Sequence, residues 1–212
     1  SDEEDKRSLI RLLRSTNAAH RARAQEIVQR LGEKALPELH EMTGDRRVEA
    51  ALAAYKLLGN LAHKESLPYL LAGLYPRRSA QKPRFVTGEV AAEALRNYTI
   101  EDRLATLKAI KDLVLTTNIG RIIEGIPTQD AYPLAVRLYE SKLFYEDWSE
   151  ESGLAFLLRL DQDQAWPLVE RRLTTGVTVY SFTVFRDFFP NVTPERQMFL
   201  IDYMLKRDGD LS

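Results

Sequence analysis

The chain has 212 residues, and its 30 basic and 31 acidic side chains leave a formal net charge of −1. This balance argues against nucleic-acid binding as the main task, because that affinity depends on neutralising phosphates. No cysteine is present, which excludes disulfides, thiolate metal sites and cysteine nucleophiles. The sequence contains no apolar run of about 18 residues, so we expect no membrane-spanning helix.

Basic residues follow one side of the first predicted helix, at Lys6, Arg7, Arg11 and Arg14. Leucines occupy the opposite side of this helix. Two interpretations stay open. The basic side chains bind phosphates, or they form the solvated outer face that the terminal helix of a stack requires.

Proline recurs along the chain at a nearly constant interval, at Pro37, Pro68, Pro133 and Pro167. The intervals are 31, 65 and 34 residues, and the longest is about twice the other two. Each proline follows a small and an apolar residue. Because proline suits the first turn of a helix, we expect each one to lie just inside a helix start. A repeat of this length is typical of stacked helix pairs.

Second helices are expected between these starts, and residues 45–61 form the clearest of them. Asp45 is predicted to cap this helix and Gly59 to end it. Apolar residues surround the helix almost completely, which is typical of a helix that is covered on several sides. Residues 90–95 repeat the alanine-rich pattern.

The segment 75–85 interrupts the second clear repeat. Two prolines prevent a helix there, and four basic residues occur without an acid. We expect either a loop that contacts an acidic surface or phosphates, or a solvated insertion whose charge keeps it in water. The four candidate binding residues are Arg77, Arg78, Lys82 and Arg84.

Acidic residues gather over the segment 139–163. Paired carboxylates can serve acid–base chemistry or bind a hard cation, but no EF-hand spacing is present. A simpler interpretation is a helix start, with Ser149 as the N-cap and acids in the first turn. The candidate binding residues of this stretch are Glu146, Asp147, Glu150 and Glu151.

Residues 176–190 allow two interpretations. The segment 177–180 has strand propensity, while phenylalanines at 182, 185 and 189 fit one face of a helix. We favour the helix, because a second helix is due at this point of the repeat.

The clearest repeat combines Asp45, Val48, a run of alanines and Leu58-Gly59, after a helix that begins with Leu36-Pro37. This combination resembles a HEAT repeat, and is most similar to the short bacterial HEAT-like repeats of phycobilisome lyases. The likeness is good over residues 18–98 and loose over 100–207. Glu49 departs from it, because the family usually has arginine there. The resemblance implies an all-α fold over residues 1–212 as a single domain, a right-handed armadillo/HEAT-like superhelix of about six antiparallel helix pairs.

The resemblance also implies a binding scaffold, and it carries no catalytic residues. The sequence has no glycine-rich phosphate loop, no Gly-x-Ser-x-Gly elbow and no His-Glu-x-x-His motif. His20, His40 and His63 are not spaced as metal ligands, so we predict neither metal nor cofactor. We therefore expect a non-enzymatic adaptor that binds another protein through its concave face and the basic insertion loop.

Three further expectations accompany this one. Two alternative functions stay open, a chromophore-lyase subunit and a HEAT-like DNA glycosylase. Opposite charges on the two halves of the chain favour head-to-tail self-association. We favour a cytoplasmic location, and an exported form with a removed leader also stays open.

Overall fold

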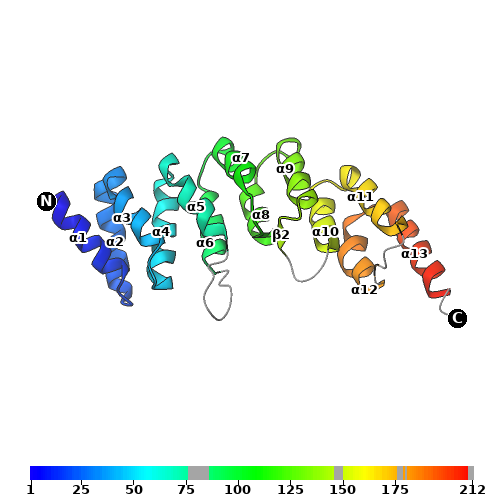
Figure 1. Cartoon of the computed structure of the whole chain (residues 1–212), viewed down its shortest axis with the longest axis horizontal. Coiled ribbons are helices and arrows are strands. Elements are labelled where there is room, and N and C mark those ends of the chain that lie inside the picture. The colour runs from blue at the N-terminus through cyan, green and yellow to red at the C-terminus, as the bar shows by residue number, and fades with distance from the viewer. Residues whose placement is uncertain (76–85, 146–149, 176–178, 180, 210–212) are drawn as a thin grey trace. The chain divides into compact units, whose positions relative to one another are not determined.

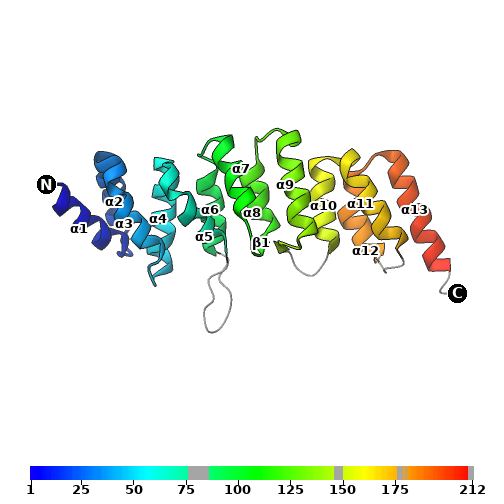
Figure 2. The same cartoon turned by 45° about the horizontal axis from the view of Figure 1, so that its top comes forward.

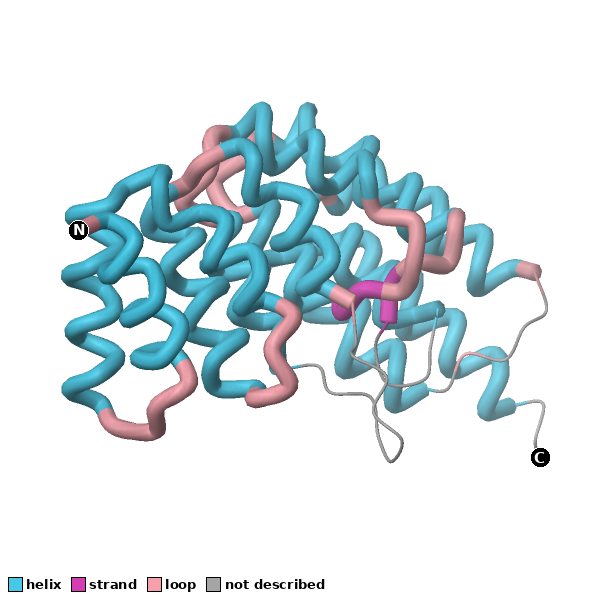
Figure 3. The backbone as a smooth tube through the Cα atoms, turned by 60° about the vertical axis from the view of Figure 1, so that its left-hand side comes forward, coloured by secondary structure: helices cyan, strands magenta, loops and turns pink. Residues whose placement is uncertain are grey.

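A computed structural model describes residues 1–75, 86–145, 150–175, 179 and 181–209 of the chain. Within these ranges the protein is all-α, and helices that follow one another in sequence pack together (Figure 1). Figure 3 shows how little of the described chain lies outside helices. The chain divides into two compact units, Ser1–Ile126 and Pro127–Ser212. Among the described residues, none of the helices combines the length and the apolar character needed to cross a bilayer.

The first unit is built from helices that pack on their neighbours in sequence. α1 packs on α2, α3 on α4 and α5 on α6, while α4, α6 and α8 lie side by side in that order (Figures 1 and 2). Two 3₁₀ turns, Gly32–Ala35 and Lys64–Ser66, precede α3 and α5, and the two-residue strand β1 (Val114–Leu115) precedes α8. The helices are α1 (Asp2–Leu13), α2 (Ala18–Leu31), α3 (Leu36–Thr43), α4 (Val48–Leu61), α5 (Leu67–Leu74), α6 (Val86–Leu95), α7 (Ile100–Ala109) and α8 (Thr116–Ile123).

The second unit continues with helices of similar length. α10 packs against both α9 and α11. The predicted helix over 176–190 is confirmed over 181–190, while residues 176–178 and 180 lie outside the described residues. There α12 leads into a π-helical turn, Val184–Phe188, and a 3₁₀ turn, Phe189–Asn191. The elements are α9 (Thr128–Glu140), β2 (Phe144–Tyr145), α10 (Glu150–Leu160), α11 (Gln162–Thr174), α12 (Ser181–Thr183) and α13 (Pro194–Gly209).

The prolines mark helix starts in only part of the chain. Pro37 and Pro68 lie in the first turn of α3 and α5, as predicted. Pro133 and Pro167 lie inside α9 and α11, so the predicted starts there are wrong. α11 begins earlier because the side chain of Asp161 accepts the N–H groups of its first turn.

α4 is buried along most of its circumference, as its composition predicts. Gly59 does not end it, because the helix continues to Leu61 and is terminated by Ala62 in the left-handed conformation, with φ 48°. Glycine is needed at 59 for another reason. A Cβ added there would lie 2.7 Å from the Cβ of Ala94 on α6, so the absence of a side chain lets the two helices approach closely.

Arg103 on α7 fixes the end of α8. Its side chain is buried, and its Nη1 donates to the carbonyls of Ile122, at 3.2 Å, and Glu124, at 2.7 Å. These carbonyls belong to the last turn of the helix, which lacks intrahelical donors. A cation at this position also complements the negative end of the helix dipole.

Candidate functional site

A groove of about 530 Å³ runs across the second helices of the first unit. We call it the second-helix groove. It crosses α4, α6 and α8, which lie side by side in Figures 1 and 2. Its lining residues are Lys56, Asn60, Glu89, Val90, Glu93, Ala94, Asn97 and Arg121.

The floor of the groove follows from the close approach of α4 and α6. Gly59 and Ala94 meet where the helices cross, and neither carries a side chain longer than a methyl group. The longer side chains of Lys56 and Asn60 come from α4, and that of Asn97 comes from just after α6. Small residues at a helix contact thus let polar groups from two helices line one groove.

The groove offers polar groups, from α4 and from just after α6, that are free to bind. Lys56 and Asn60 are exposed, and in the described part of the chain neither forms a hydrogen bond or an ion pair. Asn97 donates one N–H to the Gly59 carbonyl at 3.1 Å, which leaves its second N–H and its carbonyl oxygen. An asparagine amide can donate twice and accept at its oxygen, so both asparagines can pair with a peptide group.

The two carboxylates that line the groove, those of Glu89 and Glu93, each form an ion pair with an arginine. Arg121 donates to Glu89 at 2.8 Å. Arg96 pairs with Glu93 at 2.8 Å and with Glu124 at 3.0 Å. These partly exposed pairs hold side-chain positions more than they stabilise the fold. Among the described residues that line the groove, Lys56 is therefore the cation left for a ligand.

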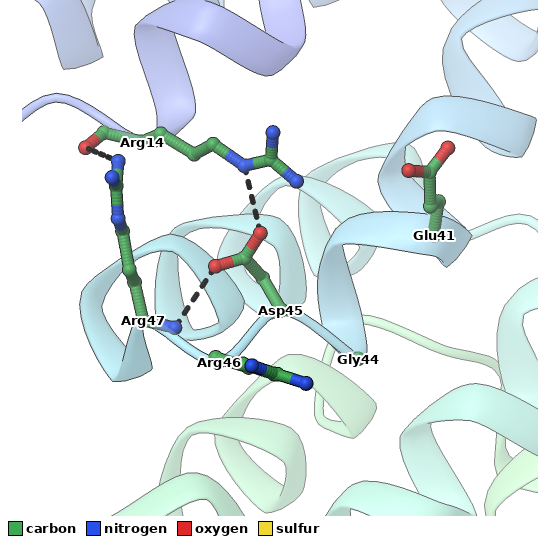
Figure 4. Close-up of a pocket in the computed structure, with 6 residues that line it drawn as sticks. All are labelled: Arg14, Glu41, Gly44, Asp45, Arg46 and Arg47. Atoms are coloured by element: carbon green, nitrogen blue, oxygen red, sulfur yellow. Dashed lines mark hydrogen bonds and ion pairs between the residues drawn. The ribbon is translucent and has the colours of Figure 1, made fainter.

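A second hollow, of about 450 Å³, lies where α3 turns into α4 (Figure 4). We call its lining the arginine corner. Asp45 accepts the N–H of Arg47 at 2.9 Å and the Nε–H of Arg14 at 2.8 Å. Burial alone would raise the pKa of Asp45, but these donors outweigh it and hold the pKa below the ordinary value. The lining residues are Arg14, Glu41, Gly44, Asp45, Arg46 and Arg47.

Two of the four predicted acidic residues, Glu150 and Glu151, meet in the second unit. Glu150 and Glu151 lie in the first turn of α10, and both pair with Arg172 of α11, at 3.0 and 2.8 Å. Tyr139 of α9 donates its hydroxyl to Glu150 at 3.0 Å, and burial raises the pKa of Tyr139. Glu151 is only 7 % exposed. These contacts hold three helices together, and a binding role for the two glutamates stays a prediction.

The other predicted site residues lie outside the described residues. They are Arg77, Arg78, Lys82 and Arg84 of the basic segment, and Glu146 and Asp147 of the acidic stretch. Their proposed contacts with a partner stay predictions.

His40 belongs to a small cluster that is partly buried. Its ring stacks on Tyr69 with centroids 3.8 Å apart, and its Nε2 lies 2.9 Å from the Ser66 hydroxyl. Ser66 is fully buried, so this Ser–His pair does not present a nucleophile to a substrate. Burial lowers the pKa of His40. Over the described ranges, no three His, Cys, Asp or Glu side chains converge as metal ligands would.

The groove residues were missed by sequence reasoning, although a signal exists. In α4 the polar residues Glu49, Lys56 and Asn60 recur at intervals of seven and four, which places them on one narrow stripe of an otherwise apolar helix. In and just after α6, residues 89, 93 and 97 recur at intervals of four. A single polar stripe on a mostly buried helix marks its exposed side.

Comparisons with known proteins identify no relative, so the function is inferred from the geometry of these sites. No protein-family model matches the chain. No curated protein and no solved structure shows a significant similarity to it.

Proposed function

We propose that this protein is a non-enzymatic scaffold that binds another protein. Its helix pairs form a HEAT-like, armadillo-type right-handed solenoid of about six antiparallel pairs, and the ligand lies along the second-helix groove. The sequential packing of α4, α6 and α8 supports the first part. The observation that carries the proposal is the groove itself, with free amide and ammonium groups above a floor of small residues.

The chemistry of the groove favours an extended segment of the partner. Asn60 of α4 and Asn97, just after α6, both line the groove and present donors and acceptors. A peptide in an extended conformation has free N–H and C=O groups that match them, whereas a helix has already paired its own. Lys56 adds a charge-assisted hydrogen bond to an acidic side chain of that segment.

The basic segment extends this preference for acidic partners. Arg77, Arg78, Lys82 and Arg84 belong to the connection between α5 and α6, and α6 supplies the middle of the groove. A cluster of positive charge attached there accelerates the encounter with an acidic segment. We therefore propose that these four residues steer the partner, while the groove holds it.

Site-specific photocrosslinking tests the proposal. A photoreactive amino acid replaces Asn60 in one variant and Arg23 in another, because Arg23 is an exposed residue of α2 away from the groove. In cells of the source organism, we expect the variant at 60 to capture a discrete partner that the variant at 23 does not capture. Equal capture by both variants, or no capture together with robust turnover in a substrate screen, would reverse the proposal.

The captured partner then permits a quantitative comparison. Asn60→Ala and Lys56→Gln should each weaken its affinity by about 5- to 30-fold, because each removes a direct hydrogen bond in a desolvated groove. Lys108→Gln on α7 is the matched control, since Lys108 is exposed and the charge change is identical. Retention of a bilin, or DNA binding that falls steeply with salt, would instead support the alternative functions.

A further inference from the structure

We propose that the arginine corner binds a phosphate monoester group. The site lies apart from the second-helix groove, and its ligand differs from the segment proposed there. The hollow measures about 450 Å³ and is lined by three arginines from two places in the sequence, one after α1 and two before α4. The charge and the donor geometry of these arginines carry the proposal.

Both the backbone and the side chain of Arg14 are held by hydrogen bonds. Its backbone carbonyl accepts an N–H from Arg47 Nη1 at 3.2 Å, and its Nε–H donates to Asp45 at 2.8 Å (Figure 4). Asp45 is itself fixed by the backbone N–H of Arg47. An exposed arginine normally loses side-chain entropy when it binds. Here that loss has already occurred in the folded protein, so the guanidinium is preorganised.

The fixed guanidinium still has donors to offer. Its Nε–H is used by Asp45, and Figure 4 shows both Nη groups of Arg14 turned away from that bond, on the side of Glu41. Among the described residues, Arg46 forms no hydrogen bond or ion pair, and its exposed side chain is free to turn toward a ligand. Two guanidiniums can therefore reach one anion from different directions.

The lining favours an anion that has several acceptor oxygens. Arg14, Arg46 and Arg47 carry three positive charges, and the carboxylates of Asp45 and Glu41 compensate two of them, so one positive charge is in excess. A phosphate monoester has about −1.5 to −2 charges at neutral pH and three acceptor oxygens. A carboxylate has one charge and is satisfied by a single guanidinium fork. The N-terminal end of α4 lies at the same corner, and its dipole adds potential of the same sign.

Glu41 allows a test of the sign of the ligand's charge, because its carboxylate lies on the opposite side of the hollow from Arg14 (Figure 4). It is exposed and forms no ion pair or hydrogen bond within the described ranges. If an anion binds between Glu41 and Arg14, removing the glutamate charge strengthens binding. A ligand carrying both an anion and an ammonium group would respond in the opposite way.

The experiment is a titration of the full chain with inorganic phosphate at constant ionic strength, followed by ¹H–¹⁵N NMR. We expect saturable shifts of the amide signals of Gly44 and Arg46. Arg46→Gln should weaken binding at least about fivefold, and Glu41→Gln should strengthen it about two- to fivefold. Lys108→Gln on α7 removes the same charge outside both sites, so it is the matched control and should change the affinity less than about twofold, since solvent and salt screen distant charges.

A phosphoserine tripeptide distinguishes the two sources of such a group. Binding of the peptide at least about tenfold tighter than inorganic phosphate assigns the site to phosphorylated protein segments. Equal affinity assigns it to free phosphate compounds. Linear, non-saturable shifts, equal weakening by Arg46→Gln and Lys108→Gln, or weaker binding after Glu41→Gln would each overturn the proposal. These variants keep the fold because Arg46, Glu41 and Lys108 are exposed.

Discussion

Gly59→Ala tests the contact that forms the floor of the groove. In an exposed helix this substitution stabilises by about 1 kcal/mol, because alanine has the higher helix propensity. At position 59 the new Cβ would lie 2.7 Å from the Cβ and 2.8 Å from the Cα of Ala94. Carbon atoms normally pack about 3.5–4.0 Å apart. The two helices must therefore separate by about 1 Å.

The magnitude follows from setting these two effects against each other. Overpacking of a close contact typically costs about 1–3 kcal/mol, and part of the clash is with backbone atoms of Ala94, which cannot turn away. After the gain in helix propensity is subtracted, we expect a net loss of up to about 2 kcal/mol in the free energy of unfolding. For a chain of this size, each kcal/mol corresponds to a fall in melting temperature of about 2–4 °C.

Urea denaturation followed by circular dichroism measures the effect. Gly44→Ala is the matched control, because Gly44 has φ −88° and a Cβ there meets only the Glu41 carbonyl, at 3.4 Å. Its effect should stay within about 0.5 kcal/mol. Adding Ala94→Gly to Gly59→Ala should restore part of the loss, with a coupling of at least about 0.5 kcal/mol. A Gly59→Ala variant more stable than wild type would refute the close approach of α4 and α6.

Two other substitutions test single groups. Arg103→Met should lower the free energy of unfolding, measured by chemical denaturation, by about 2–3 kcal/mol, because the carbonyls of Ile122 and Glu124 lose a charged donor. A similar loss from Arg23→Met, at an exposed position, would contradict this role of Arg103. Because burial lowers the pKa of His40 in the folded protein, the unfolded state takes up the proton first, at its ordinary value of 6.5. The stability of wild type relative to His40→Gln should therefore be constant above about pH 7.5 and decline as the pH falls through 6.5 toward the lower folded value. A pH-independent difference between the two proteins down to about pH 5.5 would show that this burial is absent.

Local sequence determined the helical character of the chain. Proline in a first turn, as at Pro37 and Pro68, and an apolar helix such as α4 depend on interactions within a few residues. The same local reasoning placed the starts of α9 and α11 too late, because these helices begin at Thr128 and Gln162 and carry Pro133 and Pro167 in their interiors.

Tertiary packing decided the candidate sites. Gly59 carries the same sequence signal whether it ends a helix or lets a neighbouring helix approach, and only Ala94 on α6 distinguishes the two roles. The arginine corner joins Arg14 to Asp45, 31 residues later in the chain. Periodicity along one segment reports which side of a helix is buried. It does not report which other helix covers that side, because that depends on contacts between distant residues.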